Sequence, residues 1–504
     1  MTSSINRGFG LTPSEKLLAH LANHTFLDLW SWPNVYKTPG KELCDLLVVS
    51  GEDVVIFSDK SVEWSSGDIK VAWPRWYRRA INKSVDQIRG AARWIRNNPR
   101  EVYVDAKCGQ RVPLDLPTTE RRRVHGICVA LGAEKAASAY FNDPDGTFMV
   151  APHLKDDDHI DFNTKGHFPF AIGDVDSSGH FVHVFNQFAL DLVMRELDTI
   201  TDFIDYLTAR EEFIRSGRLM ISPSEMEMLA HYLLFFRDGR HSFPRPEDVG
   251  APADMSVQFV VGEYAALVAS PEYERRREEN RKSYAWDHTI RSFTENVLRG
   301  TQYPILGIRP DVQMAERALR IMAREDRLRR RALGHSLIGA IFALEQQKVA
   351  RFARIVMPDA GLNNPGLAYV FLVFARGESE HEHYRQIRAS ILQTYCLATL
   401  HDHRALERCV GVAVSARSDV GSSEDVIALD QPDWTSEEME SLREARTYYE
   451  VLLNPIKTAR SSIVMEDFPP DPALVGLSRQ QRRAIERSLR KKDRRRRAAH
   501  INEA

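Results

Sequence analysis

Residues 40–60 read GKELCDLLVVSGEDVVIFSDK, and this stretch decides how the rest of the chain is interpreted. Two apolar, largely β-branched runs flank the SGED segment at residues 50–53, a pattern that predicts a β-hairpin. A tight turn in this segment places Asp45 opposite Ser58. Lys60 then lies on the same face, one diagonal step away, because side chains along a strand alternate between faces.

An acid and a lysine therefore converge at one end of an otherwise apolar hairpin. Buried charges require a partner or a metal ion. A metal-dependent phosphodiester hydrolase uses such a pair: a carboxylate holds a divalent cation, and a cationic group polarises water or stabilises developing charge. Asp45 and Lys60 are the first candidate catalytic residues.

This local pattern resembles the PD-(D/E)XK nuclease superfamily, particularly its Mrr-like and nuclease-related branches. There an acid begins one strand, and a D/E-x-K triplet ends the next. Asp45 matches the first acid and Lys60 matches the lysine, but Ser58 stands where the acid of the triplet is expected. Asp59 is the nearest acid, and a regular strand directs it to the opposite face. Either a β-bulge re-aims Asp59, or the second carboxylate comes from elsewhere, or the metal site is degraded.

Two flanking helices add to the resemblance, which covers residues 10–100. The first begins near residue 11 and carries Glu15 in its first turn. The superfamily usually has an acid on this helix, which implies a site role for Glu15. A second helix is predicted over residues 76–95, with an apolar stripe along one side. It carries Gln87, where superfamily members often place a polar residue near the site.

The resemblance thus implies a Mg²⁺ or Mn²⁺ ion held by Asp45, with Glu15 or Asp59 as further ligands. Simpler interpretations compete for every residue. Asp45 can begin a strand beside a turn, and Asp59 with Lys60 can form a solvated strand end. Glu15 suits the first turn of any helix because of the helix dipole, and Gln87 suits any helix surface.

Length and composition set the wider limits. A chain of 504 residues is too long for one compact domain. Its 43% hydrophobic and 27% charged content is that of an ordinary globular protein, and its net charge of −2 confines nucleic-acid affinity to local patches. The five cysteines form no C-x-x-C motif, which argues against a zinc ribbon and fits a reducing cytoplasm. The sequence shows neither a signal peptide nor a membrane-spanning run, so we expect a cytoplasmic protein without a membrane partner.

The expected fold class is α/β, of mixed α+β type, with a restriction-endonuclease-like sheet at the N-terminus. The expected parts are a nuclease-like domain at 1–214 (core 11–100, sheet extension 101–187), a mostly helical region at 215–345, a second smaller α/β unit at 346–455 with a linker at 418–433, and a basic C-terminal arm at 466–504.

Two helical stretches look continuous by their periodicity, at residues 187–214 and 313–333. The second is rich in arginine, which could follow a phosphate backbone, although interleaved acids also favour pairing within the helix. Six of the eight tryptophans precede residue 100. They could stack on nucleic-acid bases, but packing in a domain core is the commoner role.

The C-terminal arm has the strongest charge asymmetry in the sequence. Such an arm suits binding to a DNA or RNA backbone without sequence preference; a disordered solubilising or partner-binding tail is the alternative. The residues expected to contact nucleic acid are Arg482, Arg483, Arg490, Lys491, Lys492, Arg494 and Arg495.

These observations favour a metal-dependent nuclease, a hydrolase acting on nucleic acid and more specifically on DNA. A role in bacterial defence or DNA processing is an extrapolation from the resemblance. The alternative is a catalytically inactive nucleic-acid-binding or scaffold protein on the same fold. The sequence leaves a homo-oligomer or a protein partner open.

Overall fold

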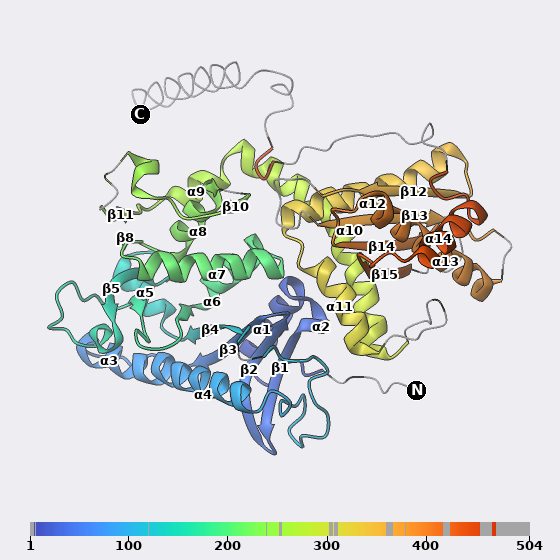
Figure 1. Ribbon diagram of the computed structural model, residues 1–504. Coiled ribbons are helices and arrows are strands. Elements are labelled where there is room, and N and C mark those ends of the chain that lie inside the picture. Colours follow the sequence, from blue (N-terminus) through green and yellow to red (C-terminus); the bar gives the residue numbers. More distant parts are fainter. Residues whose placement is uncertain are drawn as a thin grey trace.

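The chain is a mixed α/β protein with two larger β-sheets separated by long helices (Figure 1). Its structure is a computed structural model. The residues that it describes are 5, 7–118, 120–237, 239–250, 252, 255–301, 306, 311–358, 366–377, 380–416, 424–453 and 466–469.

The N-terminal sheet is built around the predicted hairpin. Its strands are β1 (Ser31–Thr38), β2 (Lys41–Ser50), β3 (Asp53–Ser61), β4 (Arg123–Leu131) and β7 (Val182–Phe185), in the order β1-β2-β3-β4-β7. The first three pair antiparallel, and β3, β4 and β7 run parallel. Leu46 faces Phe57 and Ser50 faces Asp53, so the predicted register is confirmed. Gly51 occupies the turn with φ +63°, a conformation that favours glycine.

Helices cover both faces of this sheet. The helix α1 (Pro13–Thr25) begins with a capping box between Thr12 and Glu15, and it leads through α2 (Leu27–Trp30) into β1. Phe26, at the end of α1, contacts Phe57 on one face of β3. The next residue, Ser58, faces the other side of the sheet. Its hydroxyl donates a hydrogen bond to Gln87 of α4 (Lys83–Asn97). The helix predicted over 76–95 is interrupted: α3 (Ile69–Tyr77) and a π-helical turn at Arg78–Asn82 precede α4.

The early tryptophans pack inside this domain. Trp30, Trp32, Trp73 and Trp76 are fully buried, and Trp73 stacks on Trp76 with ring centroids 5.6 Å apart. Because these four rings are enclosed, they offer no platform for nucleic-acid bases.

The sheet extension is only partly as predicted, because β5 (Met149–Lys155) and β6 (Ala171–Asp174) form a separate parallel pair. The helix predicted over 187–214 is two helices, α6 (Gln187–Glu196) and α7 (Ile200–Arg215). Thr199 caps the second by accepting a hydrogen bond from the backbone N–H of Asp202.

The remaining elements of residues 134–258 are short. They are α5 (Glu134–Phe141), the 3-10 turns Asp156–His159 and Pro246–Val249, and the strands β8 (Leu219–Ile221), β9 (Phe236–Arg237), β10 (Arg240–His241) and β11 (Val257–Gln258).

The middle region is mostly helical. It contains α8 (Glu225–Leu234), α9 (Glu263–Val268), α10 (Pro271–Arg299), α11 (Val312–Ala323) and α12 (Arg327–Gln347). One helix was predicted over 313–333, but the chain breaks between α11 and α12, where Asp326 caps α12. Arg327 and Arg330 are buried and paired with Asp287, so they are not placed to follow a phosphate backbone.

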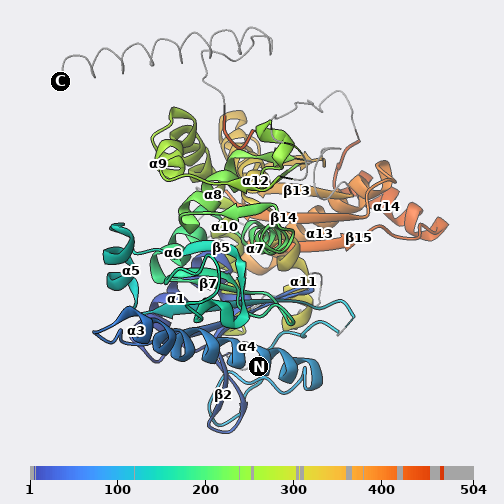
Figure 2. The ribbon, with the colours of Figure 1, turned by 90° about the vertical axis from the view of Figure 1, so that its left-hand side faces the viewer.

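The C-terminal sheet has the order β12-β13-β14-β15. Its elements are β12 (Arg351–Val356), β13 (Leu367–Phe374), α13 (His381–Asp402), β14 (Arg408–Ser415), β15 (Glu424–Asp430) and α14 (Ser436–Tyr448). The linker predicted at 418–433 is wrong for residues 424–430, which form β15. Its short Val-Ile-Ala-Leu run pairs along β14. Helices α10 and α11 lie between the two sheets (Figures 1 and 2).

Two expectations meet the limits of the described residues. The basic C-terminal arm, with Arg482, Arg483, Arg490, Lys491, Lys492, Arg494 and Arg495, lies outside them. The search for membrane spans, restricted to the described part of the chain, finds no helix with the length and apolar character to cross a bilayer.

Candidate functional site

The predicted convergence of Asp45 and Lys60 is observed. The ammonium nitrogen Nζ of Lys60 lies 3.5 Å from Oδ2 of Asp45, at the end of the hairpin remote from its turn. The backbone N–H of Asp59 also donates to this oxygen, at 2.6 Å. The Asp45 side chain is 4% exposed, whereas that of Lys60 is 30% exposed. The carboxylate is thus held from inside the fold while the amine reaches the surface.

Glu15 approaches the same end of the sheet, but it is also part of a helix cap. Its Oε2 accepts bonds from the backbone N–H of Leu11, at 2.8 Å, and from the side-chain amide of Asn34, at 2.8 Å. The Asn34 amide also donates to Oε1 of Glu42, at 2.9 Å. Asn34 therefore joins two carboxylates, one from α1 and one from β2.

Glu42 and Asn34 are residues that the sequence did not reveal. Glu42 lies three positions before Asp45, which in a regular strand points it to the other face. The pairing of β1 with β2 shifts register around Tyr36, opposite Glu42. Asn34 adopts φ +48°, in the left-handed region that asparagine tolerates. Only the acid-rich composition of this strand end could have pointed to Glu42.

Asp59 is not re-aimed by a bulge. β3 pairs with β4 in unbroken register from Asp53 to Ser61, so the bulge alternative is wrong. The continuous parallel ladder keeps Asp59 on the face opposite Ser58. The carboxylate is nevertheless buried, and neither of its oxygens has a hydrogen-bond partner of good geometry in the described structure.

Gln87 supports the other face of the strand. Ser58 donates its hydroxyl hydrogen to Oε1 of Gln87, with 2.9 Å between the two oxygens. Gln87 therefore holds Ser58 in place, and its contact with the Asp45–Lys60 pair runs through Ser58. On the same helix Arg89 is already paired with Asp176, whereas Arg93 and Arg96 are exposed.

The carboxylates carry more negative charge than Lys60 can balance. Burial raises the pKa of Asp59 to about 6, and the charges of Asp45 and Glu15 add to this, while Ser14 and Lys60 oppose it. Burial also raises the pKa of Asp45; Lys60 and the Asp59 amide lower it, and Glu15 raises it. The pKa of Glu42 is raised by burial and by the Asp45 and Glu15 charges.

Glu15 behaves differently. Burial by itself would raise its pKa, but the hydrogen bonds from Asn34, Leu11 and Thr12 outweigh burial and lower it. Glu15 is therefore charged at neutral pH and contributes to the shared repulsion at this end of the sheet.

The fit of a divalent cation to these residues is partial. A bound cation would relieve the repulsion among Asp45, Asp59 and Glu15, and the oxygens of Asp59 have bonding capacity to spare. Among the described residues, however, no three His, Cys, Asp or Glu side chains are grouped closely enough to hold a metal ion. The carboxylates would have to draw together, with Asp45 and Asp59 as the first candidate ligands.

Known proteins add no assignment to this geometry. The chain matches no family model, no curated protein and no solved structure. The function is therefore argued from the arrangement of the residues themselves.

Proposed function

We propose that the chain is a metal-dependent phosphodiester hydrolase that cleaves nucleic acid, with DNA as the favoured substrate. The observation that carries this proposal is the Asp45–Lys60 pair, at 3.5 Å, inside a group of carboxylates with raised pKa values. Perturbed carboxylates beside a partly exposed lysine are typical of catalytic sites. The arrangement also agrees with the PD-(D/E)XK resemblance, in which an acid and a lysine occupy neighbouring strand ends.

Each residue has a distinct role in this proposal. Asp45 and Asp59 would hold Mg²⁺ or Mn²⁺, with Glu15 as a further carboxylate. Such an ion, when bound, supplies Lewis acidity at the phosphoryl oxygen and acidifies water. Lys60 would orient the attacking water or stabilise negative charge at phosphorus. Gln87 is a positioning residue, because it acts through Ser58.

A second candidate function is a nucleic-acid-binding protein without catalysis. Two observations favour it: Ser58 occupies the position of the expected acid, and Oδ2 of Asp45 already accepts the Asp59 amide. In this case Lys60 neutralises Asp45 and the fold serves only for binding.

Plasmid cleavage with Mg²⁺ or Mn²⁺, against a chelator control, separates the two functions. An active enzyme should lose at least about a hundredfold in rate in Asp45→Asn and in Lys60→Met, the size of effect usual for an essential catalytic group. Lys135→Met, at an exposed lysine on α5, is the matched control and should cleave like the wild type. Cleavage that survives both site substitutions refutes the hydrolase assignment. DNA binding without metal-dependent cleavage supports the second candidate.

A further inference from the structure

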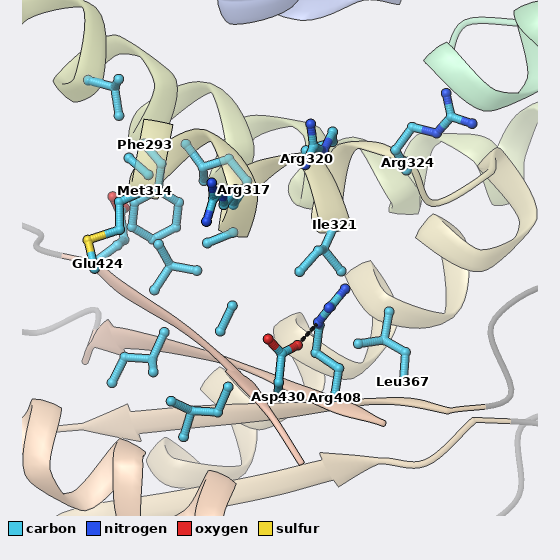
Figure 3. A pocket seen from close by; sticks show the side chains of 18 of the residues that line it. Phe293, Met314, Arg317, Arg320, Ile321, Arg324, Leu367, Arg408, Glu424 and Asp430 are labelled. Carbon is cyan, nitrogen blue, oxygen red and sulfur yellow. Dashed lines mark hydrogen bonds and ion pairs between the residues drawn. The ribbon is translucent and has the colours of Figure 1, made fainter. Parts of the chain in front are cut away.

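A groove of about 1430 Å³ lies between the turn of the N-terminal hairpin and the C-terminal sheet, at the opposite end of the hairpin from Asp45 and Lys60. One of its walls is α11, and the hairpin turn contributes Ser50, Gly51 and Glu52 to the lining. The opposite wall is β15, from Val426 to Asp430, together with Glu424. We call this cavity the β15 groove. Figure 3 shows α11, with Arg317, Arg320 and Ile321, on one side of the groove and the Arg408–Asp430 pair on the other.

The β15 groove runs around the outer edge of a strand. Val426 and Ala428 pack toward the core that α10 and α11 share, whereas Ile427 and Leu429 pack toward the core beneath α13. Residues from both faces of β15 line the cavity. A cavity can touch both faces only if it passes around the strand's open edge.

The open edge of β15 has no strand partner within the described residues. In the order β12-β13-β14-β15, β15 pairs only with β14. Every second residue along an edge strand directs its backbone N–H and C=O outward, and these groups are a template for another strand. Natural edges are often protected by charge or proline, yet the centre of β15 reads Val-Ile-Ala-Leu. The opposite edge, β12, carries Arg351 and Arg354 and packs against α12.

The wall facing β15 carries positive charge. Arg317 and Arg320 lie on α11 and Arg324 is its C-cap residue; their spacings of three and four residues place them along one side of the helix. Arg320 pairs with Glu316, and Arg324 pairs with Asp53, which leaves their side chains 34% and 28% exposed. Arg317 is exposed, and no hydrogen bond or ion pair joins it to another described residue.

The occupant of the β15 groove should match both walls. We propose that the groove docks an extended acidic peptide segment of a partner protein, added as a strand to the free edge of β15. Backbone hydrogen bonds to β15 would give affinity, and alternate carboxylate side chains would meet the α11 arginines. Small apolar side chains on the other face would pack beside Ile427 and Leu429. A single-stranded nucleic acid suits the groove less well, because Phe293 is the only aromatic side chain among the lining residues that the structure describes, apart from His381.

The proposal does not depend on phosphodiester hydrolysis, so its test uses binding to the full chain. The probe is a fluorescein-labelled peptide of alternating Glu and Val, long enough to span the seven residues of β15. Fluorescence anisotropy should show saturable binding. The same peptide N-methylated at every second residue should bind at least about tenfold more weakly, because it cannot complete the ladder; so should a Lys-Val peptide, because it meets arginines.

A charge reversal on the protein tests the α11 wall. Arg317→Glu should weaken binding of the Glu-Val peptide by about tenfold or more. Arg75→Glu, at an exposed arginine of α3, is the control and should leave binding unchanged. Amide hydrogen exchange in residues 424–430 should slow when the peptide binds.

Several results would overturn the proposal. These are no saturable binding of the Glu-Val peptide, equal binding of the N-methylated or Lys-Val peptide, and an unchanged affinity in Arg317→Glu. A thymidine octanucleotide that displaces the peptide and binds more tightly would assign the groove to nucleic acid instead. A self-associated protein whose 424–430 amides are already protected, and which the peptide does not dissociate, would assign it to a second copy of the chain.

Discussion

The strand β3 carries a buried aspartate near each end, and the two have opposite electrostatic surroundings. Asp53 accepts bonds from Arg123 at 2.8 Å and from Arg324 at 2.7 Å, and His125 lies 3.2 Å away. Burial would raise its pKa, but these partners hold the pKa well below 3.8. Asp59 lies on the same face six residues later, and its pKa is raised to about 6. Burial alone therefore does not decide the state of a carboxylate; the difference lies in what surrounds it.

The two ends of β3 therefore have different roles. Asp53 ties the hairpin to the C-terminal end of α11 through Arg324, the C-cap residue, which is an architectural role. Asp59 and Asp45 are kept in a state that favours gaining a proton or a cation. The comparison can be tested by removing each charge in turn. Six of the eight tryptophans lie in the first 100 residues, so intrinsic fluorescence follows unfolding of this part of the full chain.

The largest change in folding stability is expected from substitution of Asp53. Asp53→Asn should destabilise the N-terminal part by about 3 kcal/mol, because it removes an ion pair to two arginines and leaves a buried amide among donors. The shift of the urea midpoint measures this. Glu52→Gln, at the exposed neighbouring position, is the control. Equal midpoints in the two variants would show that the Asp53 cluster does not hold the hairpin.

At Asp59 we expect the substitution to stabilise the folded protein rather than destabilise it. A carboxyl whose folded pKa is raised from 3.8 to about 6 stabilises the fold below pH 4, and this contribution is lost as the pH rises through 6. Asp59→Asn should therefore match the wild type at pH 4 and be more stable by about 2 kcal/mol at pH 8. Urea midpoints at the two pH values give the comparison. A stabilisation that is the same at both would point to packing rather than charge.

The smallest change in folding stability is expected from the binding of a divalent cation. A divalent cation that binds the folded state stabilises it by about 1.4 kcal/mol at ten times its Kd. Mn²⁺ should thus raise the urea midpoint of the wild type at pH 8, and Asp45→Asn should abolish this shift. In Glu52→Gln the shift should persist. If Mn²⁺ leaves the urea midpoint of the wild type unchanged, the end of β3 near Asp59 does not bind metal. That result would agree with the second candidate function, a nucleic-acid-binding protein without catalysis.

The sequence was informative where local rules govern the structure. The SGED turn and the flanking apolar runs fixed the register of the hairpin, and the Asp45–Lys60 contact followed from the period of a strand. The helix starting near residue 11 was predicted from its cap, which the structure shows as a capping box. The mixed α/β class followed from the alternation of such patterns.

Other features depend on contacts that no local rule contains. Glu42 joins the site because β1 and β2 slip in register and Asn34 turns back with positive φ. The breaks before α7 and α12 are set by capping residues inside stretches that keep a helical period. The polar neighbours and short apolar run of β15 predict a linker rather than a strand. Its pairing with β14 is a tertiary contact.

Glu15 has a consequence for the order in which carboxylates would respond to a cation. Its Oε2 already fastens the first turn of α1 and holds Asn34, so moving it would loosen both. Losing such a cap costs about 1 kcal/mol. Asp59 has no comparable hydrogen bond to surrender. A cation should therefore recruit Asp59 first and leave the beginning of α1 wound, and faster amide exchange at Leu11 upon loading would reveal the opposite sequence of events.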